Sequence, residues 1–198
     1  MKKSRAKIKI GVLALQGAFV EHARILQQLD VEASLVRLPK ELDGLDGLII
    51  PGGESTTISR LMADFHLMQP LMDLAQAGIP ILGTCAGMIL LARDVGGNSV
   101  PSLGVMDIRV KRNAFGRQVD SFEADIDISA LGAPPFHAIF IRAPMVEKVG
   151  PEVEVLARLS DGTVIAARQD KLVASAFHPE LTSDLRFHRY FLEIVASA

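Results

Sequence analysis

The fold is decided by the stretch Ile79-Pro80-Ile81-Leu82-Gly83-Thr84-Cys85-Ala86-Gly87. Its apolar start predicts a strand over Ile79–Leu82, and the uncharged run Met88–Ala92 predicts a buried helix. A strand, a Gly-x-Cys-x-Gly turn and a helix together describe a nucleophile elbow. A helix N-terminus favours an anion, so Cys85 is predicted to be a reactive thiolate. The alternative is a buried cysteine that only fills space.

On the N-terminal side of this stretch, nearly continuous apolar segments, which predict buried strands, alternate with segments in which apolar residues recur at helical spacing. The expected strands of this first part are Lys7–Leu15, Ala33–Leu38, Gly47–Ile50 and Ile79–Leu82. Helices are expected over Phe19–Leu29, over Gln69–Ala77, and from an N-cap in Ser55-Thr56-Thr57 to Asp64. Such an alternation indicates a parallel, doubly wound sheet whose ligands lie beyond the carboxyl ends of the strands.

The later part of the chain has strands without long helices between them. They are expected over Val105–Val110, Phe122–Ile128, Ala138–Ile141, the hairpin Val153–Leu159 and Thr163–Arg168, and Leu172–Phe177. A final helix is expected over Asp184–Ala196. The predicted fold class is therefore α/β, with a doubly wound, mostly parallel sheet, flanking helices and an antiparallel strand extension.

Composition narrows the classes of function. A length of 198 residues fits one domain over residues 1–198, in which residues 1–6 are expected to be a disordered extension. A formal charge of −2 does not suggest a nucleic-acid or membrane partner. A single cysteine excludes an internal disulfide framework and fits a reducing, cytoplasmic compartment. No cluster of residues has metal-ligand spacing, so no metal is expected. A secretory leader is the disfavoured interpretation of the basic N-terminus.

A base for the thiol is expected at the end of the last strand, in Phe177-His178-Pro179-Glu180. If that strand joins the same sheet, His178 emerges at the same edge as Cys85 and can pass protons. Glu180 then fixes the imidazole if Pro179 bends the chain. The alternative is a surface turn. The remaining histidines are expected to be structural: His22, His66, His137 and His188.

Two further pieces are expected at this edge. The turn Pro51-Gly52-Gly53-Glu54 can present a backbone N–H to an oxyanion together with the N–H of Ala86, or it is merely a strand-to-helix turn. Arg112 and Arg142 each follow an apolar strand. They can clamp a substrate carboxylate or remain solvated surface charges.

These pieces resemble the class I (triad) glutamine amidotransferases, and more narrowly the glutaminase subunits of two-component pyridoxal 5′-phosphate synthases, from about Lys7 to the C-terminus. The resemblance rests on the elbow, on Phe177-His178-Pro179-Glu180-Leu181-Thr182 and on four further stretches: Leu15-Gln16-Gly17-Ala18 with Glu21-His22, Pro51-Gly52-Gly53-Glu54-Ser55-Thr56-Thr57, Arg112-Asn113-Ala114-Phe115-Gly116-Arg117-Gln118, and Ile141-Arg142-Ala143-Pro144. It implies a flavodoxin-like amidotransferase fold and no cofactor.

The resemblance also implies a reaction. Cys85 attacks the side-chain amide of glutamine, His178 shuttles protons and Glu180 orients it; a γ-glutamyl thioester forms, and water then frees glutamate. Gly53 and Ala86 form the oxyanion hole. The residues that hold L-glutamine are Gly52, Gly53, Glu54, Arg112, Ile141 and Arg142. The ammonia passes to a (β/α)₈-barrel synthase in a large hetero-oligomer that makes the vitamin B6 cofactor, and Gln16 lies near that interface.

Two departures from the family pattern are Ala114, where Ser is usual, and Ala176, where a small polar residue is common. Three other interpretations stay open. The chain is a glutaminase that serves another biosynthetic synthase, a cysteine hydrolase or stress protein on a similar fold, or a flavodoxin-like binding module with a structural cysteine.

Overall fold

The computed structural model describes residues 7–97, 100–112 and 121–198. The expectations for residues 1–6 and for Ala114 and its neighbours lie outside these ranges. Among the helices of the described ranges, none has the length and apolar character needed to cross a bilayer.

Most strands join one large sheet. The strands are β1 (Lys9–Leu13), β2 (Glu32–Val36), β3 (Gly47–Ile50), β4 (Ile81–Thr84), β5 (Ala92–Gly96), β6 (Met106–Lys111), β7 (Ser121–Ile126), β8 (Phe136–Ile141), β9 (Met145–Val149), β10 (Glu154–Arg158), β11 (Val164–Gln169) and β12 (Leu172–Ser175). The order is β2-β1-β3-β4-β12-β11-β9-β6-β5, with β10 against β11. The strands β2, β1, β3, β4 and β12 are parallel, and β11 turns the sheet antiparallel.

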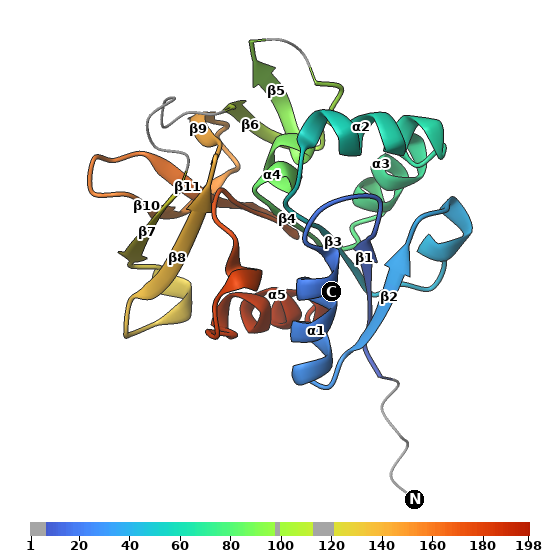
Figure 1. The fold of residues 1–198 in the computed structure, drawn as a ribbon, viewed down its shortest axis with the longest axis horizontal. Helices are drawn as coiled ribbons and strands as arrows, with labels where there is room; N and C mark the ends of the chain where they lie inside the picture. The colour runs from blue at the N-terminus through green and yellow to red at the C-terminus, as the bar shows by residue number, and fades with distance from the viewer. Residues whose placement is uncertain (1–6, 98–99, 113–120) are drawn as a thin grey trace, which may run out of the picture.

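Helices cover both faces of this sheet. They are α1 (Phe19–Gln28), α2 (Ser55–Asp64), α3 (Met68–Gln76), α4 (Ala86–Leu91) and α5 (Arg186–Ala196), with short 3₁₀ turns η1 (Pro39–Leu42), η2 (Ser129–Leu131) and η3 (Pro179–Leu181). Helix α4 is buried along its whole length. Figure 1 shows α1 and α5 on one side of the parallel strands and α2, α3 and α4 on the other. This arrangement confirms the predicted doubly wound fold with an antiparallel extension.

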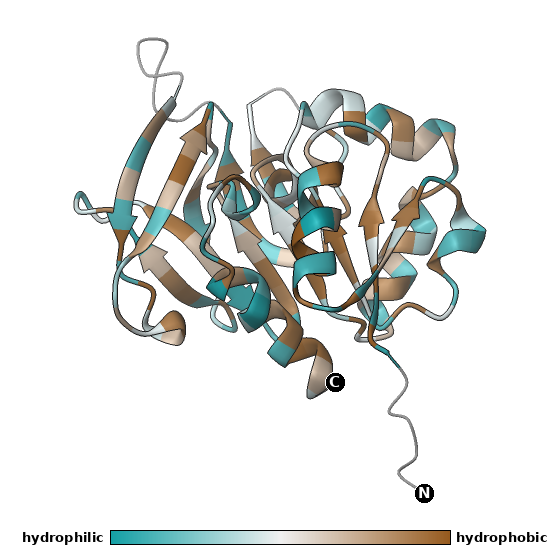
Figure 2. Ribbon diagram, turned by 60° about the horizontal axis from the view of Figure 1, so that its bottom comes forward, coloured by the Kyte–Doolittle hydropathy of each residue, from teal (hydrophilic) through white to brown (hydrophobic). Residues whose placement is uncertain are grey.

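The core follows from this layering. Strands β3, β4 and β12 are buried along their whole length, because helices cover both faces of the sheet there. Figure 2 shows these central strands as mostly hydrophobic, whereas α1 alternates between polar and apolar residues. The β7–β8 pair forms a separate two-stranded sheet beside the antiparallel part. Its strand β8 reaches the site, since the backbone N–H of His178 donates to the carbonyl of Ile139 at 2.8 Å.

Several predicted boundaries are wrong in detail. Strand β4 begins at Ile81 rather than Ile79 and includes Gly83 and Thr84, because β3 and β12 pair with it on both sides. The N-cap of α2 is Glu54 rather than a residue of Ser55–Thr57, since its carboxylate accepts from the N–H groups of Thr56 and Thr57. Strands β5 and β9 have no counterpart among the strands expected from the sequence.

Candidate active site

Cys85 occupies a strained turn between β4 and α4. Its backbone has φ 48° and ψ −100°, a left-handed conformation that is costly for a residue with a side chain. The backbones around it pass very close, because a Cβ atom on Gly87 would overlap the carbonyl oxygen of Ile50. The N–H of Cys85 donates to the carbonyl of Ser175 on β12 at 2.7 Å. The turn is thus the sharp elbow predicted from the sequence, and the adjacent strand fixes it.

His178 lies three residues beyond the end of β12 and beside Cys85. The two side chains line one cavity, and the interaction with the sulfur raises the pKa of the imidazole. On its other side, the Nδ1 atom of His178 lies 2.7 Å from Oε1 of Glu180, which η3 turns back toward the imidazole. The Glu180 side chain is fully buried. The structure therefore brings together the thiol, the imidazole and the carboxylate that the sequence placed far apart.

The charge of His178 follows from its partners. Burial lowers the pKa of this imidazole, but the hydrogen bonds with Cys85 and Glu180 outweigh burial and raise the pKa to about 10. The ring is therefore positively charged at neutral pH. For Glu180, burial acts to raise the pKa, yet the hydrogen bond with His178 and the positive charge of that ring lower it, so the carboxylate is ionised. A charged imidazole with a carboxylate behind it can donate a proton to a leaving group.

The cavity in front of the thiol has a volume of about 320 Å³. Its lining residues are Gln16, Gly53, Glu54, Ser55, Cys85, Ala86, Ile89, Arg112, Ile141, Arg142 and His178. Most of the predicted substrate residues are thus at one place. Gly52 is not in the lining, but it lies directly against the ring of His178.

The two arginines differ in their surroundings. Arg112 lies 3.4 Å from a carboxylate oxygen of Glu54, so this guanidinium already has an anionic partner. Arg142 has a left-handed backbone with φ 44° and forms no ion pair within the described part of the chain. It is the guanidinium of this cavity that is free to receive a carboxylate.

The predicted oxyanion donors lie on both sides of the thiol. Within the described residues, the N–H groups of Gly53 and Ala86 have no hydrogen-bond partner. Gln16 reaches the same turn, because its Oε1 accepts from the N–H of Glu54 at 2.8 Å and a Cβ on Gly53 would clash with it. Donors without an internal partner at this edge suit an oxyanion.

Two residues beside the site, His22 and Thr84, were not among the site residues predicted from the sequence. His22, expected to be merely structural, is fully buried with Nε2 3.3 Å from Oε2 of Glu180 and 3.1 Å from Oγ1 of Thr84. The same Thr84 oxygen accepts from the N–H of Gly52 at 3.1 Å. The available signals were the placement of Thr84 directly before the cysteine and the presence of Glu21-His22 in a stretch that resembles the family pattern.

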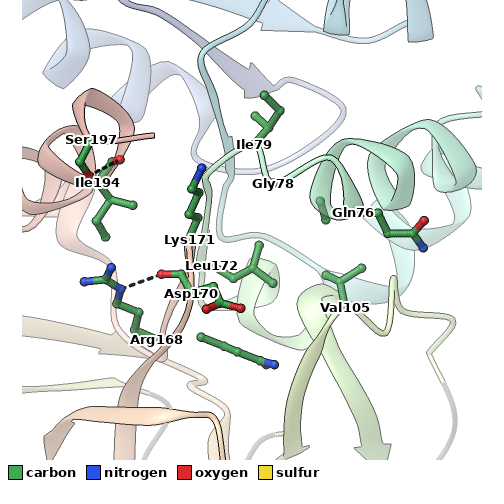
Figure 3. Close-up of a pocket in the computed structure, with 12 residues that line it drawn as sticks. Gln76, Gly78, Ile79, Val105, Arg168, Asp170, Lys171, Leu172, Ile194 and Ser197 are labelled. Atoms are coloured by element: carbon green, nitrogen blue, oxygen red, sulfur yellow. Dashed lines mark hydrogen bonds between the residues drawn. The ribbon is translucent and has the colours of Figure 1, made fainter.

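A larger cavity of about 620 Å³ lies elsewhere and is not the site (Figure 3). It is lined by residues that precede β4 and β12, including Gly78 and Lys171, so it lies at the amino ends of the parallel strands. Its lining contains neither a thiol nor an imidazole, and its Arg168 is held by the carbonyl of Asp170 at 2.7 Å. The smaller cavity at the carboxyl ends is where this fold binds ligands.

Comparison with solved structures agrees with this assignment. A structure described as a glutamine amidotransferase superposes with a TM-score of 0.90 at 50% identity, covering 94% of this chain and 98% of that one. A second glutamine amidotransferase, from Thermotoga maritima, shares the fold at 12% identity and a TM-score of 0.64, covering 98% of this chain and 86% of its own.

Sequence relatives are closer still. The pyridoxal 5′-phosphate synthase subunit PdxT of Pelotomaculum thermopropionicum is 58% identical, covering 94% of both chains. The PdxT of Herpetosiphon aurantiacus is 59% identical, covering 92% of this chain and 98% of its own. A family model matches residues 12–197. The chain belongs to the SNO glutamine amidotransferase family.

Proposed function

We propose that this chain is the glutaminase subunit of a pyridoxal 5′-phosphate synthase. It hydrolyses L-glutamine to glutamate and ammonia, and the ammonia is used by a partner synthase. The observation that carries the proposal is that Cys85 and His178 line one cavity while Glu180 lies 2.7 Å from the other side of the His178 ring. The high identity to PdxT proteins supports the choice of pathway.

The first half-reaction uses the charge arrangement around the sulfur. The Cys85 thiolate attacks the side-chain amide carbon of glutamine, and the N–H groups of Gly53 and Ala86 stabilise the oxyanion. The His178 imidazolium gives its proton to the amide nitrogen. The C–N bond breaks, ammonia leaves, and a γ-glutamyl thioester remains on Cys85.

The second half-reaction returns the enzyme to its starting state. Water attacks the thioester carbon while the now neutral His178 removes a proton from that water. The C–S bond breaks, glutamate leaves, and the thiolate and imidazolium are restored. Glu180 keeps the ring in one orientation through both proton transfers, because its Oε1 lies 2.7 Å from Nδ1.

Glutamine itself is held by the rest of the cavity. Arg142 binds the α-carboxylate, since this guanidinium has no anionic partner among the described residues. Arg112 and Glu54 form an ion pair in the lining of the cavity. Together with Gly52, Gly53 and Ile141, this pair orients the α-amino and α-carboxyl end of glutamine. The side-chain amide is thereby directed to the sulfur.

The wider setting completes the proposal. The partner is a (β/α)₈-barrel synthase subunit in a large hetero-oligomer, and the enzyme works in the cytoplasm, where its free thiol stays reduced. Residues 1–198 act as a single glutamine amidotransferase domain. Strand β12, from near the C-terminus, pairs with β4 inside the sheet, which supports one shared core.

The test is to measure glutamate formation from glutamine with the chain alone and with a pyridoxal 5′-phosphate synthase partner added. We expect turnover that depends on Cys85 and disappears in Cys85→Ala. A matched control is Arg60→Ala, an exposed residue on α2 whose loss leaves the rate unchanged. Retained turnover in Cys85→Ala contradicts the mechanism. Turnover stimulated only by a different synthase contradicts the pathway.

A further inference from the structure

A chain of buried polar side chains leads from the active site into the protein interior. From Glu180, Oε2 lies 3.3 Å from Nε2 of His22 on α1, and Nδ1 of His22 lies 2.9 Å from Nε2 of His188 on α5. Both histidines are fully buried. The three residues come from three different elements, so the contact is created only by the packing of α1 and α5 near η3.

These histidines are neutral. Burial lowers the pKa of His22 despite the attraction of Glu180, and burial lowers the pKa of His188 well below its usual value. Each ring therefore carries one proton on one of two nitrogens. The choice of nitrogen decides whether His22 presents a donor or a lone pair to Glu180.

The contacts favour one tautomer. With its proton on Nε2, His22 donates toward Oγ1 of Thr84, the carboxylate oxygen Oε2 of Glu180 lies 3.3 Å from the same nitrogen, and Nδ1 accepts from His188. With its proton on Nδ1, a lone pair would face the carboxylate. Each arrangement leaves one buried donor without an acceptor among the described residues: the hydroxyl of Thr84, which already accepts from Gly52, in the first, and Nδ1–H of His188 in the second. The negative charge of Glu180 therefore decides for the first arrangement, because an N–H rather than a lone pair then faces it.

We propose that His22 is a positioning residue of the active site: its Nε2–H faces the second oxygen of Glu180 and orients that carboxylate, and His188 fixes the tautomer. Glu180 has a hydrogen bond through Oε1, whereas within the described residues Oε2 has none. The Nε2 atom of His22 lies 3.3 Å from this free oxygen, close enough to act on it as a polar contact rather than as a fully formed hydrogen bond. The proposal rests on the proposed function only in that Glu180 orients His178 for catalysis.

The kinetic test compares two variants of the full chain assayed with its synthase partner. We expect His22→Leu to lower kcat by roughly 10- to 100-fold with little change in KM, because the polar contact of Nε2 with the charged carboxylate is lost. His22→Gln, whose amide nitrogen can occupy the place of Nε2, should recover most of kcat. Equal loss in both variants, or no loss in His22→Leu, overturns the proposal.

A matched control separates positioning from packing. Ile25→Val removes one methyl group from a buried residue on the same helix. We expect it to lower the unfolding temperature without changing kcat. If Ile25→Val lowers kcat as much as His22→Leu does, the effect belongs to the packing of α1 and the proposal fails.

The second test needs no glutamine turnover, so its outcome is independent of the proposed function. The full chain is labelled with ¹⁵N-histidine, and the signals of His22 are identified by their absence in His22→Gln. At pH 7 we expect a protonated Nε2 and an unprotonated Nδ1. In His188→Leu we expect the other tautomer to appear. A proton on Nδ1 in the wild type, or a tautomer unaffected by His188→Leu, contradicts the assignment.

Discussion

Gly52 lies against the imidazole of His178, so closely that a Cβ atom on this glycine would overlap ring atom Cε1 and come within 2.8 Å of Nδ1. The glycine is needed for space rather than for an unusual backbone angle. Any side chain there must push the ring away from Cys85, whose own Cβ lies 3.4 Å from the same position. The turn between β3 and α2 thus sets the position of the base.

Gly52→Ala should therefore lower glutaminase activity by roughly 100-fold, since a displacement of about 1 Å at the reacting groups can cost that much. The cost in unfolding free energy should be about 1–3 kcal/mol. Gly96→Ala is the control, because no atom lies nearer than 3.6 Å to its added methyl. Steady-state kinetics and urea unfolding of both variants decide the matter; full activity in Gly52→Ala would refute the steric argument.

The charge of His178 gives a prediction about pH. Its pKa in the folded protein, about 10, is above the ordinary value of 6.5. The stability contributed by this group is therefore complete below pH 6.5 and is lost as the pH rises through about 10. The difference in unfolding free energy between wild type and His178→Asn should shrink as the pH approaches 10. A difference that grows over that interval contradicts the assigned charge.

The origin of that charge is separately testable by NMR titration of His178. The hydrogen bond with Cys85 comes first among the interactions that raise this pKa, followed by the one with Glu180. Cys85→Ala should therefore lower the pKa of His178, and Glu180→Gln should lower it as well. An unchanged titration in both variants would mean that neither partner controls the ring.

Arg142 should determine glutamine affinity. If its guanidinium binds the α-carboxylate, Arg142→Gln loses a charged hydrogen bond of about 1.5–3 kcal/mol, so KM rises by roughly 10- to 100-fold. Arg109→Gln is the control, because Arg109 pairs with Asp94 and Glu147 on the exposed β5–β6–β9 surface. Isothermal titration with glutamine on the Cys85→Ala background measures binding without turnover. Unaltered affinity would remove Arg142 from the substrate site.

Glu54 caps helix α2 and also pairs with Arg112, so one substitution there should change both stability and glutamine binding. Its carboxylate caps α2 by accepting from the N–H groups of Thr56 and Thr57 at 3.1 and 2.6 Å, and it pairs with Arg112. Glu54→Ala should lower stability by about 1 kcal/mol and raise KM for glutamine. Thr57→Val removes only the hydroxyl contact to Glu54 and should have a smaller effect on both. Thermal unfolding and kinetics provide the comparison.

Local patterns in the sequence were sufficient for the central fold. Continuous apolar runs such as Gly47–Ile50 mark strands that are covered on both faces, and the structure has that strand with the same boundaries. The charged strands β5 (Ala92–Gly96) and β9 (Met145–Val149) carry no such pattern. They are strands because neighbours from elsewhere pair with them, and no local signal contains that information.

The same limit applies to the site. Cys85 and His178 each carry a local motif, so their meeting could be expected once both strands were assigned to one sheet. His22 belongs to a stretch that resembles the family pattern, but that stretch indicates no partner, and its partners Thr84 and His188 lie 62 and 166 residues away. Its neighbourhood depends on how α1 and α5 pack, which the sequence pattern does not specify.

The pairing of β4 with β12 has a consequence for biosynthesis of the protein. Thr84 faces Ser175 across these two strands, so Cys85 and His178, the proposed nucleophile and proton carrier, are brought together only when a late segment inserts beside an early one. A nascent chain that has emerged from the ribosome only as far as the elbow holds its cysteine without a proton carrier. Such a fragment, or a truncated product, should lack glutaminase activity, which we expect only after the C-terminal segment has docked.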